Sequence, residues 1–494
     1  MTVWVILAIY VVLMAATGFI SFKKADTLTG FVVGSRSAGP WFSAFGFGTT
    51  YFSAVIFIGY AGRSGFDYGL FAILIGIGNA ILGSWLAWKV LANRTREVTR
   101  RLKIKSMPQF FEKRYFSRNM KLYAAIIVFI FMTPYSASVY SGLSYLCESV
   151  LHVPYQIAMA AIAVVSGIYL VLGGYFATLL ADFIQGIIML VGVAAMLFFV
   201  SESEQVGGFA SGVTKVWESM CAQSDVLFTP QTALSVICLI LLTSVGSWGM
   251  PQMVHKFYGI KNEDGVKKGT VISTLFALII AGGAYYIGSL SRIFFTEVPT
   301  LDGKANYDLI VPQILTQTLP VILLGVVLVL VVSASVSTLS GITLTSCSTI
   351  SMDLVADRVS KFAEDKAKTL TLTRVLCAVF ILVSYLIASF KTPILTLMSF
   401  SWGTISGAFL APYMLGLYWK GMNRAGAWCG MITGPVVSLG LALLSGFNSA
   451  YATIFGVAAM AVSFLACWIG SLVAAKMGKV QDNSHFYDKA YFVK

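Results

Sequence analysis

Long apolar stretches, separated by short polar segments, run through almost the whole chain. A helix that crosses a bilayer needs about 20 mostly apolar residues, and thirteen stretches meet this need. The pattern predicts an all-α polytopic membrane protein with about 13 transmembrane helices. These spans are expected around residues 3–20, 40–62, 68–89, 122–148, 155–173, 178–200, 232–256, 268–291, 318–351, 370–389, 394–418, 425–445 and 450–475.

Lys and Arg concentrate on alternate connections between the predicted spans. With the N-terminus of the first span outside, only five of the 34 basic residues fall on the outer side, which leaves 29 facing the cytoplasm. That asymmetry follows the positive-inside rule. We therefore expect a multi-pass protein of the plasma membrane with its N-terminus outside and its C-terminus in the cytoplasm. The five outer residues are Arg63, Lys215, Arg292, Lys304 and Lys391.

Composition narrows the class of protein further. The chain is 57% hydrophobic and 11% charged, with a mean hydropathy of +0.82, whereas about a quarter of the residues of a soluble domain are charged. The net charge of +13 follows from the topology and indicates no nucleic-acid partner. Three His and seven Cys show no metal-ligand spacing, and no nucleophile with a base is evident, so we expect no enzyme. One transmembrane domain over 1–494, surrounded by lipid and without an obligate protein partner, is expected.

Two of the predicted spans are interrupted by helix-weakening residues. One contains FGFGTT (Phe45–Thr50) and the other SVGSWGMP (Ser244–Pro251). Non-helical backbone at membrane depth is tolerated where it lines a cavity, although the glycines alone would also suit close helix packing. The two spans lie five apart, so they run in opposite directions. This predicts a five-plus-five inverted repeat, over 40–200 and 232–418, with an extra N-terminal helix (1–22), two C-terminal helices (425–475) and a site at the midplane.

A hydroxyl-rich stretch, SASVSTLSGITLTS (Ser333–Ser346), closes one of the most apolar spans. On a helix, small residues of this stretch share one face. Neutral oxygen ligands suit a hard monovalent cation such as sodium. Ser and Thr in membrane helices also bond to their own backbone and pack against neighbours, and spacing alone leaves both interpretations open. The shared face consists of Ala334, Ser337, Thr338, Gly341 and Thr345.

Asp182 is the one carboxylate that these spans place inside the membrane. An ionisable residue at that depth is a functional candidate. The alternative is an acid in the first turn of a helix, where the helix dipole favours it.

Several motifs together resemble the sodium:solute symporters, the family that includes transporters of proline, pantothenate, monocarboxylates and glucose. The resemblance extends from about Asp26 to Gly426. It implies the five-plus-five inverted repeat of LeuT-like transporters, with broken first and sixth core helices and alternating access. The motifs are VGSRSAGPW (33–41), SMPQFFEKRY (106–115), GGYFATLLADFIQG (173–186), GMPQMVHKF (249–257), VSTLS (336–340) and LYWKGMNRAGA (417–427).

The resemblance also implies ligands for the ion and the solute. The shared sodium site of the family corresponds to the backbone carbonyls of Thr49, Phe52 and Ala334 and the hydroxyls of Ser337 and Thr338. A second sodium, or a proton, corresponds to Asp182, Ser337 and Ser340, but Gly341 offers no oxygen at the third serine position. The implied solute site contains Thr50, Tyr51, Ser53, Tyr135, Ser247 and Trp248.

These residues depart from the proline branch at three positions. Proline symporters carry an acid where this chain has Tyr51, and aromatics where it has Thr243 and Ser247. The run TYFSA (50–54) is more similar to the pantothenate and monocarboxylate branches, and Arg63 follows it closely.

Together these observations predict a sodium-coupled secondary active symporter that imports a small carboxylate-bearing solute, such as proline, pantothenate or a monocarboxylate. Sodium is the expected coupling ion. A proton-coupled transporter that uses Asp182 is the nearest alternative. A channel would show a filter-like polar segment, and a sensor on a transporter fold would be expected to carry a soluble domain.

Overall fold

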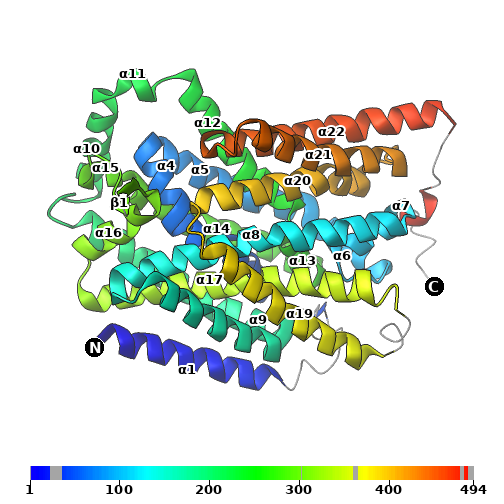
Figure 1. Cartoon of the computed structure of the whole chain (residues 1–494), viewed down its shortest axis with the longest axis horizontal. Coiled ribbons are helices and arrows are strands. Elements are labelled where there is room, and N and C mark those ends of the chain that lie inside the picture. Colours follow the sequence, from blue (N-terminus) through cyan, green and yellow to red (C-terminus); the bar gives the residue numbers. More distant parts are fainter. Residues whose placement is uncertain (1, 23–35, 302, 360–364, 479–482, 488–494) are drawn as a thin grey trace.

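The computed structural model describes residues 2–22, 36–301, 303–359, 365–478 and 483–487. Its helices run largely along one direction and form one bundle (Figure 1). The strands in the described part of the chain are a short antiparallel pair, β1 (Thr300–Leu301) and β2 (Lys304–Ala305). The all-α fold is therefore confirmed.

The described helices include fewer clear membrane spans than the thirteen predicted. Ten described helices are long and apolar enough to cross a membrane, and the bent pair Pro40–Tyr51 and Val55–Tyr68 raises this to eleven. Thr2–Thr17 and Tyr155–Gly167, at the first and fifth predicted spans, are apolar too, and they are parts, with described side chains, of the longer helices Thr2–Phe22 and Tyr155–Ser201. Every predicted span thus overlaps an apolar helix, but the count of about 13 is not confirmed.

The first half of the chain contains the first predicted repeat. The motif that begins at Val33 lies partly outside the described residues, as do the side chains of 168–177. Both predicted spans at 155–173 and 178–200 fall within the single element α9. The elements are α1 (Thr2–Phe22), α3 (Pro40–Tyr51), η2 (Val55–Tyr60), α4 (Ala61–Tyr68), α5 (Phe71–Gly78), η3 (Asn79–Leu86), η4 (Trp88–Ala92), α6 (Asn93–Arg101), α7 (Met107–Tyr115), α8 (Arg118–Leu151) and α9 (Tyr155–Ser201).

The second half begins after a connection formed by α10 (Phe209–Ala222) and α11 (Ser224–Leu227) and again consists mostly of long helices. The elements that follow are α12 (Pro230–Ile240), η5 (Leu241–Val245), η6 (Gly246–Gly249), α13 (Pro251–Tyr258), α14 (Glu263–Ser289), α15 (Ser291–Phe294), η7 (Tyr307–Leu309), α16 (Ile310–Thr318), α17 (Val321–Thr349), η8 (Ile350–Val355), α19 (Lys366–Ala388), α20 (Ile394–Tyr418), α21 (Arg424–Leu444), η9 (Ser449–Tyr451), α22 (Ala452–Lys476) and α23 (Ser484–Tyr487).

Both predicted interruptions are present. In the first, α3 ends at Tyr51, Phe52 is extended (φ −108°, ψ 120°), and the chain resumes with a bend of 46°. The break therefore follows FGFGTT, which is itself helical, rather than lying within it. In the second, Met250 is extended (φ −83°, ψ 119°) and Pro251 begins α13, because proline fits the first turn of a helix, where its missing N–H is not needed.

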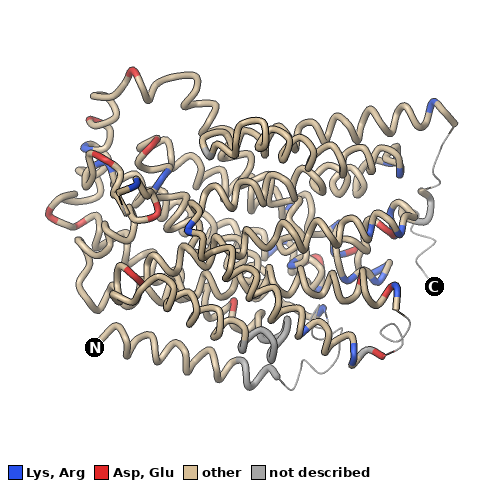
Figure 2. The backbone as a smooth tube through the Cα atoms, viewed as in Figure 1, with Lys and Arg blue, Asp and Glu red and all other residues tan. Residues whose placement is uncertain are grey.

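Charged residues are distributed unevenly along the bundle. Most Lys and Arg lie at the end where α22 finishes, and α1 begins at the opposite end (Figures 1 and 2). Opposite ends for the first and last long helices require an odd number of crossings. The arrangement agrees with the predicted charge asymmetry, while the orientation in the membrane stays a prediction.

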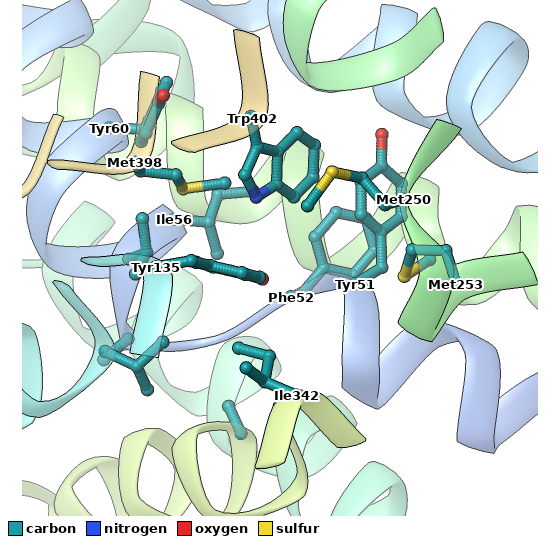
Figure 3. Packing of buried hydrophobic residues seen from close by; sticks show 14 of the residues in the cluster. Tyr51, Phe52, Ile56, Tyr60, Tyr135, Met250, Met253, Ile342, Met398 and Trp402 are labelled. Carbon is teal, nitrogen blue, oxygen red and sulfur yellow. The ribbon is translucent and has the colours of Figure 1, made fainter. Parts of the chain in front are cut away.

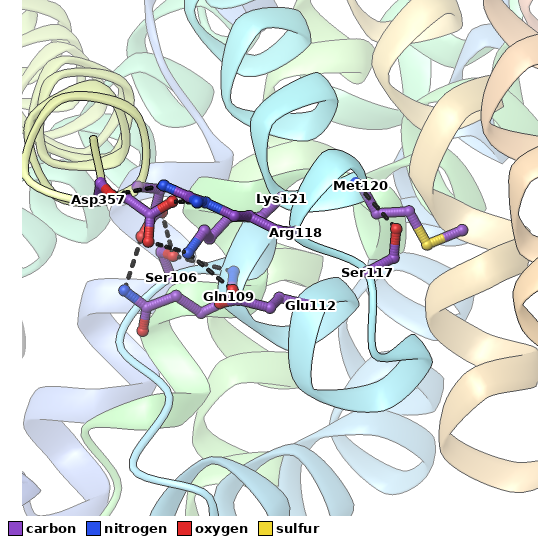
Figure 4. A network of polar contacts seen from close by, with 9 residues as sticks. Ser106, Gln109, Glu112, Ser117, Arg118, Met120, Lys121 and Asp357 are labelled. Atoms are coloured by element: carbon purple, nitrogen blue, oxygen red, sulfur yellow. Dashed lines mark hydrogen bonds and ion pairs between the residues drawn. The ribbon is translucent and has the colours of Figure 1, made fainter.

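At the basic end, a polar network joins α7 and α8 to the segment that follows η8 (Figure 4). The Lys121 ammonium lies 2.8 Å from both Glu112 and Asp357, and Arg118 donates to Asp357. Partial burial raises the pKa of Asp357, but hydrogen bonds from Lys121 and Arg118 outweigh it and hold this pKa below its usual value. Removing Lys121 would leave the two acids without their shared partner, and the network holds α7 and α8 against the segment after η8.

Candidate ion and solute site

Four oxygens converge where α17 passes the end of α3. The Thr338 hydroxyl oxygen lies 3.0 Å from the Ala334 carbonyl, 3.2 Å from that of Thr49 and 3.3 Å from that of Thr50. A hydroxyl carries one hydrogen, so it can satisfy only one of three acceptors. The last carbonyls of a helix also lack intrahelical partners and carry its negative dipole end. The cluster is therefore electronegative and suited to a cation.

Ser337 extends this cluster on its other side. Its hydroxyl oxygen lies 2.9 Å from the Thr49 hydroxyl, which donates to the Phe45 carbonyl at 2.9 Å. The same Ser337 hydroxyl donates to the Asp182 carboxylate at 2.5 Å. All of these side chains are buried. A serine whose hydrogen is used by a carboxylate still presents lone pairs to a neighbouring cation.

The break after α3 frees the carbonyl of Phe52. In a continuous helix this carbonyl would accept a hydrogen bond from the N–H of Ile56. That N–H donates instead to the backbone carbonyl of Ser53 at 3.1 Å. The structure therefore brings together the carbonyls of Thr49 and Ala334 and the hydroxyls of Ser337 and Thr338, with Phe52 at the adjoining break. Thr50, which the resemblance implies for the solute, contributes its carbonyl to the same cluster.

A small cavity adjoins the break, and none of its lining residues comes from α17. Two of the residues predicted for the solute, Tyr51 and Ser53, line it. Its walls are mainly aromatic and apolar (Figure 3), as small-molecule sites commonly are. The other lining residues are Phe52, Val55, Ile56, Tyr60, Asn79, Thr243, Tyr285, Met398 and Trp402.

Two buried donors face one another across this region without an acceptor. The rings of Tyr135 and Trp402 lie perpendicular, with centroids 5.6 Å apart, and they point toward the space beside Tyr51 and Phe52 (Figure 3). Neither the Tyr135 hydroxyl nor the Trp402 indole N–H has a hydrogen-bond partner. An unpaired buried donor costs about 1–3 kcal/mol, and a bound acceptor would remove that cost.

A family model described as the sodium:solute symporter family matches residues 31–434. The chain belongs to the sodium:solute symporter family. As a member of this family the protein is a transporter and not an enzyme.

Curated relatives of this symporter match it over most of both chains. It is 27% identical over 438 residues to the sodium/proline symporter of Escherichia coli (strain K12), which covers 87% of this chain and 85% of that one. It is 27% identical over 440 residues to an osmoregulated proline transporter of Bacillus subtilis (strain 168), covering 88% and 87% of the two chains. Among solved structures, a sodium-coupled sialic acid symporter superposes with a TM-score of 0.78 at 19% identity, over 96% and 98% of the chains, which confirms the LeuT-like fold.

The remaining residues predicted for the solute lie near the second break of the symporter. Ser247 donates to the Ser244 carbonyl at 2.7 Å, and the Trp248 indole donates to the Leu82 carbonyl at 3.1 Å. Neither lines the cavity. Arg63 also lies outside the lining and pairs with Asp67 at 3.5 Å. The lining of the cavity therefore comes mainly from the first break, with Met398 and Trp402 contributed by α20.

Three residues beside these sites were not among the predicted ones. Asn79 accepts from Thr243 and Ser244 at 2.9 and 3.0 Å and so fixes the second interrupted span. Trp402 enters from α20, and Lys256 pairs with Asp182. The sequence could have identified Lys256 as a candidate, because it lies only five residues after Pro251 and hence in the second half of a broken helix. Asn79 and Trp402 reach these sites through tertiary packing, and no local sequence pattern predicts that placement.

Asp308 lies outside the spans, and its environment is expected to make the stability of the protein depend on pH. Burial raises its pKa to about 7, although the Ile394 N–H, 3.2 Å away, and Arg63 work in the opposite direction. The folded state thus holds a proton that the unfolded state releases near pH 4. The contribution of Asp308 to the free energy of unfolding is therefore greatest below about pH 4. It declines by at most about 1.4 kcal/mol per pH unit as the pH rises to 7. We expect Asp308→Asn, which still accepts from Ile394, to reduce the fall in melting temperature between pH 5.5 and 7.5. An unchanged fall would assign the dependence to another group.

Proposed function

We propose that this chain is a sodium-coupled symporter that imports a small carboxylate-bearing solute across the plasma membrane, with its N-terminus outside and its C-terminus in the cytoplasm. The observation that carries the sodium assignment is the convergence of three carbonyls on the single hydroxyl of Thr338. Discontinuous helices that offer carbonyls at the midplane are a common way to bind a coupling ion. Inward movement of one positive charge releases about 2.3 kcal/mol per 100 mV.

The ion and the solute are coupled through one short segment. Thr49 and Thr50 supply carbonyls to the oxygen cluster, and the next residues, Tyr51 to Ser53, line the cavity. An ion bound to these carbonyls would order the break and with it the cavity wall. Each ligand then increases the affinity for the other by the same factor, because coupling free energies are reciprocal.

The solute proposal rests on the relatives and on the cavity. Two similar chains are named for proline, and the cavity beside the first break has mainly aromatic and apolar walls with a few polar groups, as small-molecule sites commonly do. The unpaired donors of Tyr135 and Trp402 suit a carboxylate. Apolar walls such as Ile56 and Met398 would contact a hydrocarbon ring. Proline is therefore the first candidate, ahead of pantothenate and monocarboxylates.

Thermal stabilisation of the purified protein tests this proposal. A ligand that binds only the folded state at 100 times its Kd adds about 2.7 kcal/mol. We expect proline to raise the melting temperature in sodium but not in potassium at the same pH. Prolinamide, which lacks the carboxylate, is the matched control and should have little effect. Stabilisation that is equal in both salts would contradict sodium coupling, and a response to pantothenate or lactate alone would replace proline as the solute.

A further inference from the structure

A buried ion pair lies against the oxygen cluster. The Lys256 ammonium on α13 is 2.8 Å from one carboxylate oxygen of Asp182 on α9, and the two side chains are only 4% and 1% exposed. The pair packs on the backbone of α3, where a Cβ on Gly46 would lie 3.2 Å from that oxygen and 3.8 Å from the ammonium. A side chain at Gly46 would therefore disturb the pair.

Both oxygens of Asp182 are already in use. One contacts the Lys256 ammonium, and the other accepts the hydrogen of Ser337. The other candidate ligand for a second cation is directed elsewhere, since the Ser340 hydroxyl donates to the Val336 carbonyl of its own helix at 2.7 Å. Gly341 has no side-chain oxygen. Of the groups suggested for a second cation, only Ser337 reaches Asp182.

Charge balance then decides how many cations the region holds. A buried carboxylate without a counter-charge is costly, and here the ammonium supplies that charge. A second sodium beside the same pair would leave a net positive charge in a buried site. We propose that Lys256 is a built-in cation that takes the place of a second sodium at Asp182, so that one sodium ion moves with each solute. This inference rests on the proposed function and extends it to the stoichiometry.

The ion pair also serves the first sodium. By holding one oxygen of Asp182, Lys256 leaves the other to fix the Ser337 hydrogen, which turns the Ser337 lone pairs toward Thr49. Lys256 is therefore a positioning residue for sodium as well as a substitute cation. Because it lies on α13, it links the two interrupted spans at the site.

The test compares sodium and solute fluxes in proteoliposomes. We expect the wild-type protein to take up one sodium ion per solute, with a Hill coefficient for sodium near 1. Lys256→Met removes the charge at similar length, so Asp182 becomes available and the Hill coefficient should rise toward 2. Lys256→Arg should keep the value near 1. The double variant Lys256→Met with Asp182→Asn removes both charges and should return the coefficient to about 1.

The surface pair of Lys268 with Asp264 on α14, 3.0 Å apart and more than 60% exposed, provides the control. Lys268→Met should behave as wild type. Two sodium ions per solute in the wild-type protein would overturn the inference while leaving sodium symport intact, whereas uptake independent of sodium would overturn the proposed function itself. If Lys256→Met does not transport, sodium binding is followed by thermal stabilisation of each purified variant. A second sodium that binds wild type and Lys256→Met alike would also reject the assignment.

Discussion

Replacing Thr338 with alanine is expected to raise the sodium concentration for half-maximal uptake by about 10- to 100-fold, which corresponds to about 1.4–2.8 kcal/mol. The substitution deletes the one hydroxyl on which the carbonyls of Thr49, Thr50 and Ala334 converge. A sodium ion bound among these carbonyls would then have one oxygen ligand fewer. Ser337→Ala should act in the same direction, because it removes an oxygen beside Thr49 and the hydrogen bond to Asp182.

A hydroxyl on the same helix supplies the matched control for this experiment. Ser335 donates to the Val331 carbonyl at 2.6 Å, one turn back on α17. Ser335→Ala should therefore retain the wild-type dependence on sodium, and Thr338→Ser, which keeps the hydroxyl, should recover most of the lost affinity. The solute affinity of Thr338→Ala should be weak at low sodium and recover at high sodium. If alanine at Thr338 and at Ser335 gave the same sodium dependence, the cluster would be a packing contact.

The periodic features of the sequence predicted the fold well. Apolar stretches identified each spanning helix, because a bilayer imposes the same length on every span. The glycines and Pro251 identified the two breaks, since both residue types weaken a helix wherever it lies. The position of the first break was displaced by a few residues, from FGFGTT to Phe52–Ala54. Local residues set the tendency to break, while packing around α3 selects the place.

The candidate site was predictable only in its local part. The face of α17 that carries Ser337 and Thr338 followed from helical spacing, and the resemblance supplied the facing carbonyls. The partner of Asp182 lies 74 residues away on α13, and Trp402 is 267 residues beyond Tyr135 in the chain. Such pairs meet because both halves of the bundle close on one cavity. Their juxtaposition depends on tertiary contacts that composition and periodicity do not encode.

Replacing Trp402 with phenylalanine should weaken the binding of a carboxylate-bearing solute by about 10- to 100-fold, while the sodium affinity measured without solute changes little. The variant keeps a smaller aromatic ring against Tyr135 and removes the indole N–H, which has no partner in the protein. A hydrogen bond to a charged group contributes about 1.5–3 kcal/mol. The stabilisation of the purified variant by proline in sodium should fall accordingly, and Tyr135→Phe should cause a loss of similar size.

Selectivity among ligands separates this role from a general packing effect. If the indole N–H binds a carboxylate, the variant should lose affinity for proline and not for prolinamide, so that the preference between the two falls. A cavity enlarged by the smaller ring would lower the affinity for both ligands by the same factor, because their hydrocarbon parts are identical. Trp468→Phe on α22, whose side chain is 53% exposed, controls for the loss of an indole elsewhere and should leave both affinities unchanged. Equal losses for proline and prolinamide in Trp402→Phe would assign Trp402 to the cavity wall and leave the carboxylate without its proposed donor.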